Sequence, residues 1–283
     1  MRIFIAGIGG FLGSRLAAQC RSHGHAVSGS SHRSLEPMSG VCVSQVSLGG
    51  RMPPEALTNH DLLIHCTYVR KATVSDNVES ARRLHQAAAD AGVPWQLFLS
   101  SYSARPNATT DYGRIKYELE CFFLDRGDTI VRPGLVVGEG GLFAHYVRQM
   151  RRFPVTPLLD GGEGRLPVIA ITDFLCAMGL AIDDRMKGAV NLFDPELIKM
   201  RRLAELIARA SKRPFLPVSI PGAFAEWMLV QCGRLGLSRP VDVDNIGAQK
   251  QNQSVIHESD LPKILRIPMS TEAAIEAVVP RIK

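Results

Sequence analysis

The chain has 283 residues, of which 46% are hydrophobic, and its 33 basic and 27 acidic side chains leave a net charge of +6. This length allows one large domain or two smaller ones, and the apolar content is enough to bury a substantial core. Because Arg and Lys occur only in short clusters without interleaved aromatic residues, the charge indicates a solvated surface rather than a nucleic-acid groove.

The six cysteines are typical of a reduced protein. They form no Cys-x-x-Cys pair and no spacing with histidine that suits a metal ion, and most lie within apolar runs. The first residues, MRIFIAG, enter a strand pattern without a charged leader, and no apolar stretch approaches the roughly 18 residues of a membrane helix. We therefore expect a cytoplasmic protein without membrane insertion or a metal site.

The first half of the chain alternates short apolar runs with longer helical patterns. Buried parallel strands are predicted at 2–6, 26–30, 41–46, 62–67, 96–101 and 128–133. Helices are predicted between several of them, at 11–23, 74–91 and 112–126. This alternation is typical of an α/β protein with a Rossmann-like, doubly wound parallel sheet.

After Pro133 the sequence becomes punctuated by Gly and Pro. A strand is predicted at 188–193, and helices at 199–210 and at 222–236, where Trp227, Met228 and Leu229 are expected in the core. We therefore predict a first domain over 1–134, to which 167–194 returns. A smaller C-terminal substrate-binding subdomain would comprise 135–166 and 195–283.

A glycine loop follows the first predicted strand. The stretch AGIGGFLGSRL contains Gly7, Gly9, Gly10 and Gly13, and the loop opens the first helix. Glycines at this place allow a tight turn and a close approach to a pyrophosphate, and a helix N-terminus offers unpaired N–H groups. The strand–turn–helix context predicts a dinucleotide site over 1–134, in which we include Phe11 and Leu12.

A phenol and an ammonium stand four residues apart in DYGRIKYELE, as Tyr112 and Lys116. Residues at this spacing share one helix face, so both side chains can act on one reacting group. The spacing alone can arise by chance, but here it follows the glycine loop and a Ser-Ser strand end. Since a tyrosine with a pKa of about 10 is a poor base, the cation of Lys116 would favour the phenolate.

These segments together resemble the extended short-chain dehydrogenase/reductase superfamily, in its NAD(P)-dependent epimerase/dehydratase (nucleotide-sugar epimerase) branch. The matching segments, in the family's order over about the first 195 residues, are the glycine loop, DLLIHCT, FLSSYS, YGRIK, VRPGLVVGEG and VIAITDFLCAM. The resemblance implies that Lys116 holds the nicotinamide ribose and that Tyr112 exchanges a proton with a substrate oxygen. The further cofactor contacts it implies are Cys66, Thr67, Asn77, Ser100 and Pro133.

A strand-end hydroxyl would orient the substrate oxygen. We assign this role to Ser101, with Ser103 as the competing choice. Dehydratases of the family usually carry acidic residues after this serine, whereas here none occurs before Asp111. The resemblance therefore favours epimerisation or plain reduction at a carbinol or keto carbon.

The end of the second predicted strand bears on the choice of cofactor. Ser31, His32 and Arg33 supply hydroxyl and cationic groups, with no carboxylate before Glu36. Such groups suit a 2′-phosphate, whereas an acidic residue there would bind the ribose hydroxyls of NAD. We prefer NADP, and NAD stays open if Arg33 is only a solvated loop residue.

The substrate is less well defined. Leu135 stands near the position where many sugar-nucleotide enzymes carry an Asn. Arg148 and Arg152 could present two guanidinium groups to a pyrophosphate or form a solvated helix face, and Arg165 follows in the same variable region.

Three hypotheses remain. The first is an epimerase or reductase of a nucleoside-diphosphate sugar, the second a reductase of a non-sugar carbonyl compound. The third is a cofactor-binding regulatory protein with vestigial activity. The resemblance also implies a possible homodimer, because relatives commonly dimerise through the helices that correspond to 74–91 and 112–126.

Overall fold

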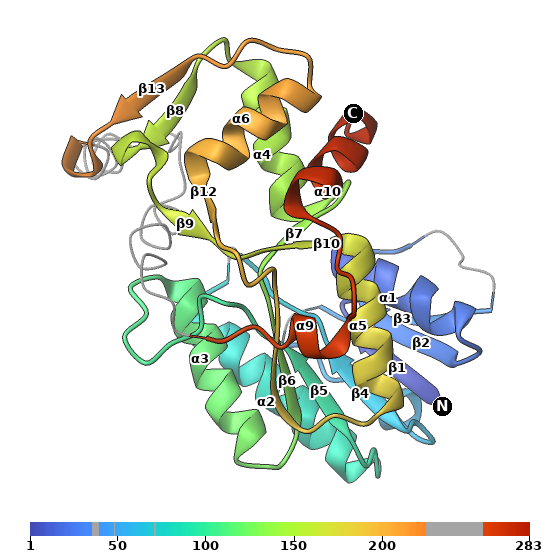
Figure 1. The fold of residues 1–283 in the computed structure, drawn as a ribbon. Coiled ribbons are helices and arrows are strands. Elements are labelled where there is room, and N and C mark those ends of the chain that lie inside the picture. The colour runs from blue at the N-terminus through green and yellow to red at the C-terminus, as the bar shows by residue number, and fades with distance from the viewer. Residues whose placement is uncertain (36–39, 48, 71, 225–256) are drawn as a thin grey trace. The chain divides into compact units, whose positions relative to one another are not determined.

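The computed structural model describes residues 1–35, 40–47, 49–70, 72–224 and 257–283 (Figure 1). The chain forms two compact units. Unit 1 comprises Met1–Pro106, Arg114–Arg132 and Leu175–Val190, and unit 2 comprises Asn107–Gly113, Pro133–Phe174 and Asn191–Lys283. The stretch that returns to unit 1 is thus narrower than the expected 167–194. Most of the helix expected at 222–236, with Trp227, Met228 and Leu229, lies outside the described residues.

Unit 1 is built on a seven-stranded sheet with the order β11-β6-β5-β4-β1-β2-β3. The strands are β1 (Arg2–Ala6), β2 (Ala26–Ser31), β3 (Cys42–Gln45), β4 (Leu62–His65), β5 (Gln96–Leu99), β6 (Thr129–Pro133) and β11 (Gly188–Leu192). The pairings from β3 through β6 are all parallel. The order reverses between β1 and β4, which confirms the Rossmann-like sheet predicted from the sequence.

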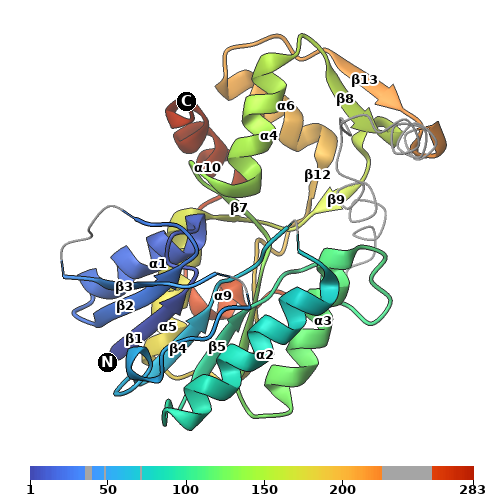
Figure 2. The ribbon, with the colours of Figure 1, turned by 180° about the vertical axis from the view of Figure 1, so that it is seen from behind.

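Helices cover both faces of this sheet. They are α1 (Phe11–Ser22), α2 (Val74–Asp90), α3 (Asp111–Leu124) and α5 (Ile171–Asp183), with a short 3-10 helix at Pro54–Ala56. Figures 1 and 2 show α2 and α3 side by side on one face, with α1 and α5 on the other. Because β4 and β5 are buried along their whole length, their sequences are apolar almost throughout, as central parallel strands require.

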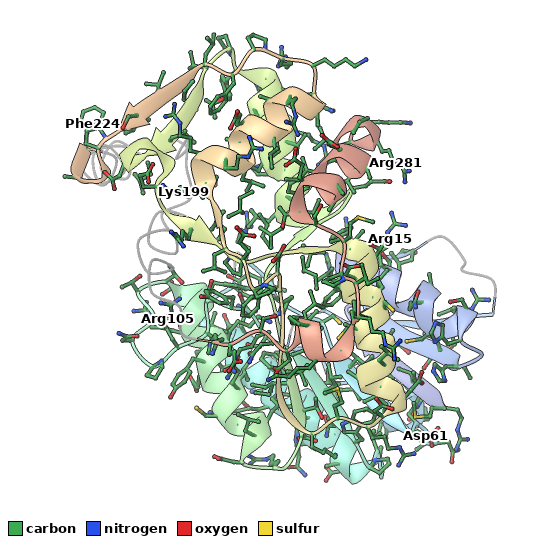
Figure 3. All side chains as sticks on the ribbon, viewed as in Figure 1. Arg15, Asp61, Arg105, Lys199, Phe224 and Arg281 are labelled. Carbon is green, nitrogen blue, oxygen red and sulfur yellow. The ribbon has the colours of Figure 1, made fainter. Side chains whose placement is uncertain are left out.

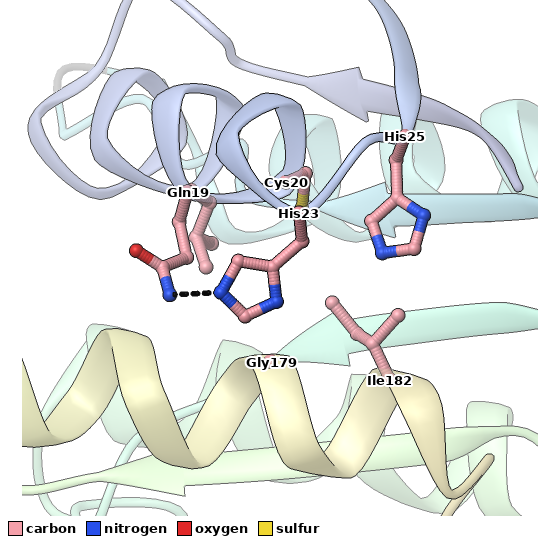
Figure 4. Close-up of a pocket in the computed structure, with 7 residues that line it drawn as sticks. Gln19, Cys20, His23, His25, Gly179 and Ile182 are labelled. Atoms are coloured by element: carbon pink, nitrogen blue, oxygen red, sulfur yellow. Dashed lines mark hydrogen bonds between the residues drawn. The ribbon is translucent and has the colours of Figure 1, made fainter.

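Helices α1 and α5 pack closely at one point, which Figure 4 shows. The His23 ring lies over Gly179, where an added Cβ would be 3.5 Å from the imidazole, and Gln19 Nε2 lies 3.0 Å from His23 Nε2. Cys20 lines the same small pocket, and burial raises the pKa of its thiol to about 11. The pocket is therefore a packing feature between the two helices, and its thiol is not activated.

Unit 2 consists of short strand pairs and helices. Its strands are β7 (Leu135–Val137), β8 (Thr156–Leu159), β9 (Arg165–Leu166), β10 (Val168–Ala170), β12 (Ile198–Lys199) and β13 (Pro217–Ile220). Its helices are α4 (Gly141–Arg152), α6 (Met200–Ala210), α9 (Leu261–Ile264) and α10 (Thr271–Val278), with 3-10 turns at Asp160–Gly162 and Val279–Arg281. The pairs β7–β10 and β8–β13 are parallel, and β9–β12 is antiparallel.

The core of unit 2 lies between α4, α6 and α10. Phe143 and Val147 of α4 pack with Leu203 and Ile207 of α6 and with Ile275 of α10. Lys199, labelled in Figure 3, precedes α6 and forms a surface ion pair of 2.7 Å with Glu163. Among the helices of the described residues, none has the length and apolar character of a membrane span.

The last residues of the chain are held by Arg151 of α4. Its guanidinium donates to the carbonyl oxygens of Val279, at 2.8 Å, and of Ile282, and its Nε contacts Ser211 Oγ at 3.4 Å. Since hydrogen bonds from a charged donor to carbonyls are stronger than neutral ones, Arg151 fastens the chain end to the core of unit 2.

We expect Arg151→Met to lower the free energy of unfolding by about 2 kcal/mol, because these carbonyl groups lose their charged donor. Arg152→Met is the matched control, since Arg152 is exposed and lies over the Phe153 ring. Urea unfolding of the two variants measures the difference. Equal losses would refute the role of Arg151.

Candidate active site

The glycine loop joins β1 to α1 in a tight turn. Gly7 has a φ of +83°, and the N–H groups of Gly7 and Ile8 both donate to the carbonyl of Ser30, at 2.9 and 3.0 Å. A Cβ at Gly13 would lie 2.3 Å from the Gly7 oxygen, and one at Gly9 would lie 2.7 Å from Ser31 Oγ. The loop therefore excludes side chains, and an added ligand can approach its backbone closely.

The first turn of α1 is suited to an anion. Gly10 is its N-cap and makes no side-chain cap, and no acidic residue occurs in the first turn. Phe11 and Leu12, the first helical residues, are half-buried. A helix start without a capping side chain leaves backbone N–H groups and the positive end of the helix dipole for a phosphate.

The end of β2 lies against this loop. Ser31 is buried, and its Oγ accepts a hydrogen bond from the Arg33 backbone N–H at 3.2 Å. The side chains of His32 and Arg33 are exposed. Residues 31–35 therefore present hydroxyl and cationic groups without a carboxylate, and Glu36 lies outside the described residues.

The end of β4 borders the glycine loop on the other side, where the strand order reverses between β1 and β4. The Cys66 N–H donates to the Ala6 carbonyl at 3.0 Å, and both Cys66 and Thr67 have atoms 3.2 Å from the position of a Cβ on Gly7. Burial raises the pKa of the Cys66 thiol to about 12, so this thiol is neutral and unreactive.

Asn77 fixes the loop that follows Thr67. Its Nδ2 donates to the carbonyls of Val69 and Thr73, and its Oδ1 accepts from the Val69 N–H at 3.0 Å. The amide is thus engaged by the backbone, and Asn77 is placed to shape the loop beside the glycine turn.

The serines at the end of β5 have different surroundings. Ser100 is buried, and its Oγ donates to Glu120 Oε1 at 2.5 Å. Ser101 and Ser103 are half-buried and belong to one turn, in which Ser101 Oγ accepts from the Ser103 N–H at 3.2 Å. Both hydroxyls stay candidates for the substrate-orienting group.

Lys116 lies at the end of β5 with its ammonium buried. Its side chain is held by a hydrogen bond from Nζ to the Leu99 carbonyl at 2.7 Å, and Nζ lies 4.6 Å from the centre of the Phe98 ring. Desolvation lowers the pKa of Lys116 to about 8, while the neighbouring Cys66 and Glu120 act in the opposite direction. Tyr112, half-buried, precedes Lys116 by one turn of α3.

The remaining expected site residues belong to unit 2. Pro133 is buried, and Leu135 is half-buried with its N–H donating to the Pro167 carbonyl at 2.7 Å. Arg148 is exposed, and its Nε donates to the Lys283 carbonyl at 2.9 Å. Arg165 is exposed on β9.

Sequence reasoning missed Glu120 and Arg132. Glu120 is buried on α3, and its carboxylate accepts two hydrogen bonds from the Arg132 guanidinium, at 2.8 and 2.7 Å. A signal was present, because Glu120 follows Lys116 at the same four-residue step that separates Lys116 from Tyr112. In the described part of the chain, no group of three or more His, Cys, Asp or Glu side chains is placed to bind a metal ion.

Comparisons with known proteins give both sequence and structural relatives. No family model matches the chain. Uncharacterized proteins of Mycobacterium tuberculosis and Mycobacterium bovis are 28% identical over 244 residues, which cover 83% of this chain. The chain spans about a quarter, 27%, of the length of these curated relatives.

Many solved structures match this chain, and three that cover nearly all of it illustrate the likeness. MoeE5 in complex with UDP-glucuronic acid and NAD has a TM-score of 0.75 at 17% identity, and covers 99% of this chain and 98% of its own. The UDP-glucose 4-epimerase of Thermus thermophilus with NAD has a TM-score of 0.73 at 18% identity and the same coverage. A nucleoside-diphosphate-sugar epimerase of Staphylococcus aureus has a TM-score of 0.75 at 16% identity, with 98% and 100% covered.

The chain shares its fold with these three structures. In this fold the glycine loop, the end of β2 and the end of β4 surround the reversal of strand order, where open α/β sheets bind ligands. Unit 1 brings these segments together around one turn, although they are spread over more than sixty residues of sequence.

Gly13 tests the packing of this glycine turn. We expect Gly13→Ala to destabilise the protein by about 1–3 kcal/mol, because the new Cβ would overlap the Gly7 carbonyl. Gly179→Ala, also within a helix, has only ordinary contacts and should be neutral or stabilising. Thermal unfolding measures both, and equal stability of the two variants would contradict the close approach.

Proposed function

We propose that the chain is an NAD(P)-dependent oxidoreductase or epimerase that acts at a carbinol or keto carbon of a nucleoside-diphosphate sugar. The observation that carries the proposal is the buried ammonium of Lys116, held at the end of β5 one turn after Tyr112. The solved relatives support the choice of ligands, because MoeE5 binds UDP-glucuronic acid and NAD, the UDP-glucose 4-epimerase binds NAD, and the third is a nucleoside-diphosphate-sugar epimerase.

The residues of unit 1 fit a dinucleotide. The side-chain-free turn at Gly7, Gly9 and Gly13 admits a pyrophosphate, and the uncapped start of α1 supplies N–H groups to it. Cys66 and Thr67 border the same turn. When bound, the nicotinamide ring supplies the acceptor or donor of a hydride.

Proton transfer is assigned to Tyr112. The positive charge of Lys116 stabilises the phenolate, so that Oη can take a proton from a substrate hydroxyl or return it to a carbonyl oxygen. Ser101 Oγ orients this oxygen, and Ser103 is the alternative in the same turn. Reduction and epimerisation both use this half-reaction.

Tyr112→Phe should reduce turnover about 10²- to 10⁴-fold and leave cofactor binding nearly unchanged, because only the proton-transfer group is removed. The assay uses a panel of UDP-sugars and simple carbonyl compounds with NAD+ or NADPH. Absorbance at 340 nm follows net oxidation or reduction, and chromatographic separation of the sugar epimers follows epimerisation, which leaves no net change in the cofactor. Tyr117→Phe on the same helix is the control. Unchanged turnover in Tyr112→Phe would sink the catalytic assignment.

For the cofactor we prefer NADP over NAD. The preference depends on Ser31, His32 and Arg33 at the end of β2, which offer a hydroxyl and cations to a 2′-phosphate. The solved relatives carry NAD, so NAD is the alternative.

Arg33→Ala should weaken NADPH binding about tenfold and leave NADH binding almost unchanged, because a charged contact to the 2′-phosphate is lost. Fluorescence titration with each reduced cofactor measures the two affinities, and His32→Ala tests the neighbouring group. Equal effects of Arg33→Ala on the two cofactors would exclude the phosphate contact.

The second candidate function is reduction of a non-sugar carbonyl compound. It is favoured by Leu135, which stands near the position where many sugar-nucleotide enzymes carry an Asn. It is also favoured by the Arg148 hydrogen bond to the Lys283 carbonyl, which engages one of the guanidinium groups considered for a pyrophosphate. Turnover of a carbonyl compound without turnover of any UDP-sugar would select this function. The third, a cofactor-binding regulatory protein, gains if the protein binds NADPH but turns over no member of the panel.

We also propose a homodimer through α2 and α3. The Arg82–Glu118 ion pair of 3.0 Å joins these helices at their exposed side.

A further inference from the structure

Glu120 is a buried carboxylate that the proposed chemistry does not use. It is 1% exposed and is the third member of the α3 face that carries Tyr112 and Lys116 at four-residue steps. Its oxygens accept hydrogen bonds from Ser100 Oγ at 2.5 Å and from the Arg132 guanidinium at 2.8 and 2.7 Å. One carboxylate thus connects α3 with the ends of β5 and β6.

The Glu120–Arg132 pair is not explained by stability alone. Transfer of a carboxylate into the interior is costly, and a bidentate guanidinium offsets much of this cost. Well-packed apolar side chains at the same positions often give equal or greater stability. We therefore expect the Glu120–Arg132 pair to act on neighbouring groups, either through its hydrogen bonds or through its charge.

The geometric consequence concerns the end of β5. Lys116 holds the Leu99 carbonyl, and Glu120, one turn later on α3, holds the hydroxyl of Ser100. Because Ser101 directly follows Ser100, holding the Ser100 hydroxyl on α3 fixes the backbone from which the Ser101 side chain extends. One face of α3 thus holds two successive residues, Leu99 and Ser100, by hydrogen bonds.

The electrostatic consequence concerns Lys116. The titratable groups acting on it are Cys66 and His65 from the end of β4, and Glu120 from α3, while Arg132 on β6 pairs with Glu120. Burial raises the pKa of Cys66 to about 12 and lowers that of His65 to about 3, so both side chains are neutral near pH 7. Among these groups, Glu120 therefore supplies the negative charge that opposes desolvation of the ammonium.

We propose that Glu120 is a positioning residue of the site: it fixes the strand end that carries Ser101 through Ser100, and it keeps Lys116 protonated through its charge. The roles of Ser101 and Lys116 in catalysis rest on the proposed function. The hydrogen bond from Ser100 to Glu120 and the effect of Glu120 on the Lys116 ammonium are independent of the proposed function.

The first experiment titrates Lys116 in the whole protein, with ¹³C-labelled lysine observed by NMR and the signal assigned by its loss in Lys116→Arg. In the wild type the midpoint should lie near pH 8. In Glu120→Gln it should move to lower pH by roughly one unit, because the opposing charge is gone. Glu118→Gln, an exposed residue of the same helix, should leave the midpoint in place.

A second variant separates this role from simple structural support. Glu120→Gln alone leaves the Arg132 guanidinium, 13% exposed, without its carboxylate, and the protein can lose stability for that reason. Glu120→Gln with Arg132→Met removes both charges and should recover the unfolding temperature while the Lys116 midpoint stays low. A midpoint at the wild-type pH in the double variant would overturn the proposal.

Turnover gives the matching readout. A protonated Lys116 is required, so activity is present below its pKa and is lost as the pH rises through it. Glu120→Gln should therefore shift the alkaline limb of kcat to lower pH, and Ser100→Ala should lower kcat without shifting that limb. If Tyr112→Phe retains full activity, the proposed function fails, whereas the NMR midpoints still decide the role of Glu120.

Discussion

Parallel pairing of the strands from β3 to β6 is the constraint on which the candidate site depends. Parallel strands place all their carboxyl ends at one edge of the sheet, and each return crossover is made by helix or loop on a face. The glycine loop, Ser31, Cys66 and Ser100 follow four of these strands. Parallel pairing alone therefore brings these groups, which are far apart in the sequence, to one edge of the sheet.

The same arrangement produces a polar cluster in a mostly apolar unit. Helix α3 packs against the end of β5. There Lys116 donates a hydrogen bond to the Leu99 carbonyl, and Glu120 accepts one from the Ser100 hydroxyl. Burial makes every uncompensated charge there expensive, so each ionised group must have a partner. The pairing of Glu120 with Arg132 satisfies this requirement. The ammonium of Lys116 donates to the Leu99 carbonyl, and its protonation depends on burial and on the nearby Glu120.

Unit 2 is stabilised by packing between helices rather than by a large sheet. Its strand pairs are short, and its stability comes from the apolar faces of α4, α6 and α10, with Arg151 attached to the last carbonyls of the chain. The arginines of α4 illustrate why surface cations are ambiguous in a sequence. Arg148 and Arg151 hold the terminal backbone, a role that depends on a segment more than 120 residues away.

Most of the sheet could be predicted from local pattern. The strands expected at 2–6, 26–30, 62–67 and 96–101 are present as β1, β2, β4 and β5, with ends that differ by at most two residues. Their apolar runs are dictated by burial on both faces, which a sequence displays directly. The burial of Glu120 could not be predicted in this way, because a charged residue on an amphipathic helix is expected to face water.

The sequence by itself determined the turn at Gly7–Gly13, because glycine tolerates the positive φ of Gly7 and a Cβ on Gly13 would lie 2.3 Å from the Gly7 oxygen. It also determined the four-residue spacing of Tyr112 and Lys116, since helical periodicity is local. Only the tertiary structure decided that Lys116 is buried against Leu99 and that Glu120 joins Ser100 to Arg132. Desolvation and hydrogen bonding between distant strands set these properties, and both arise only when the sheet has formed.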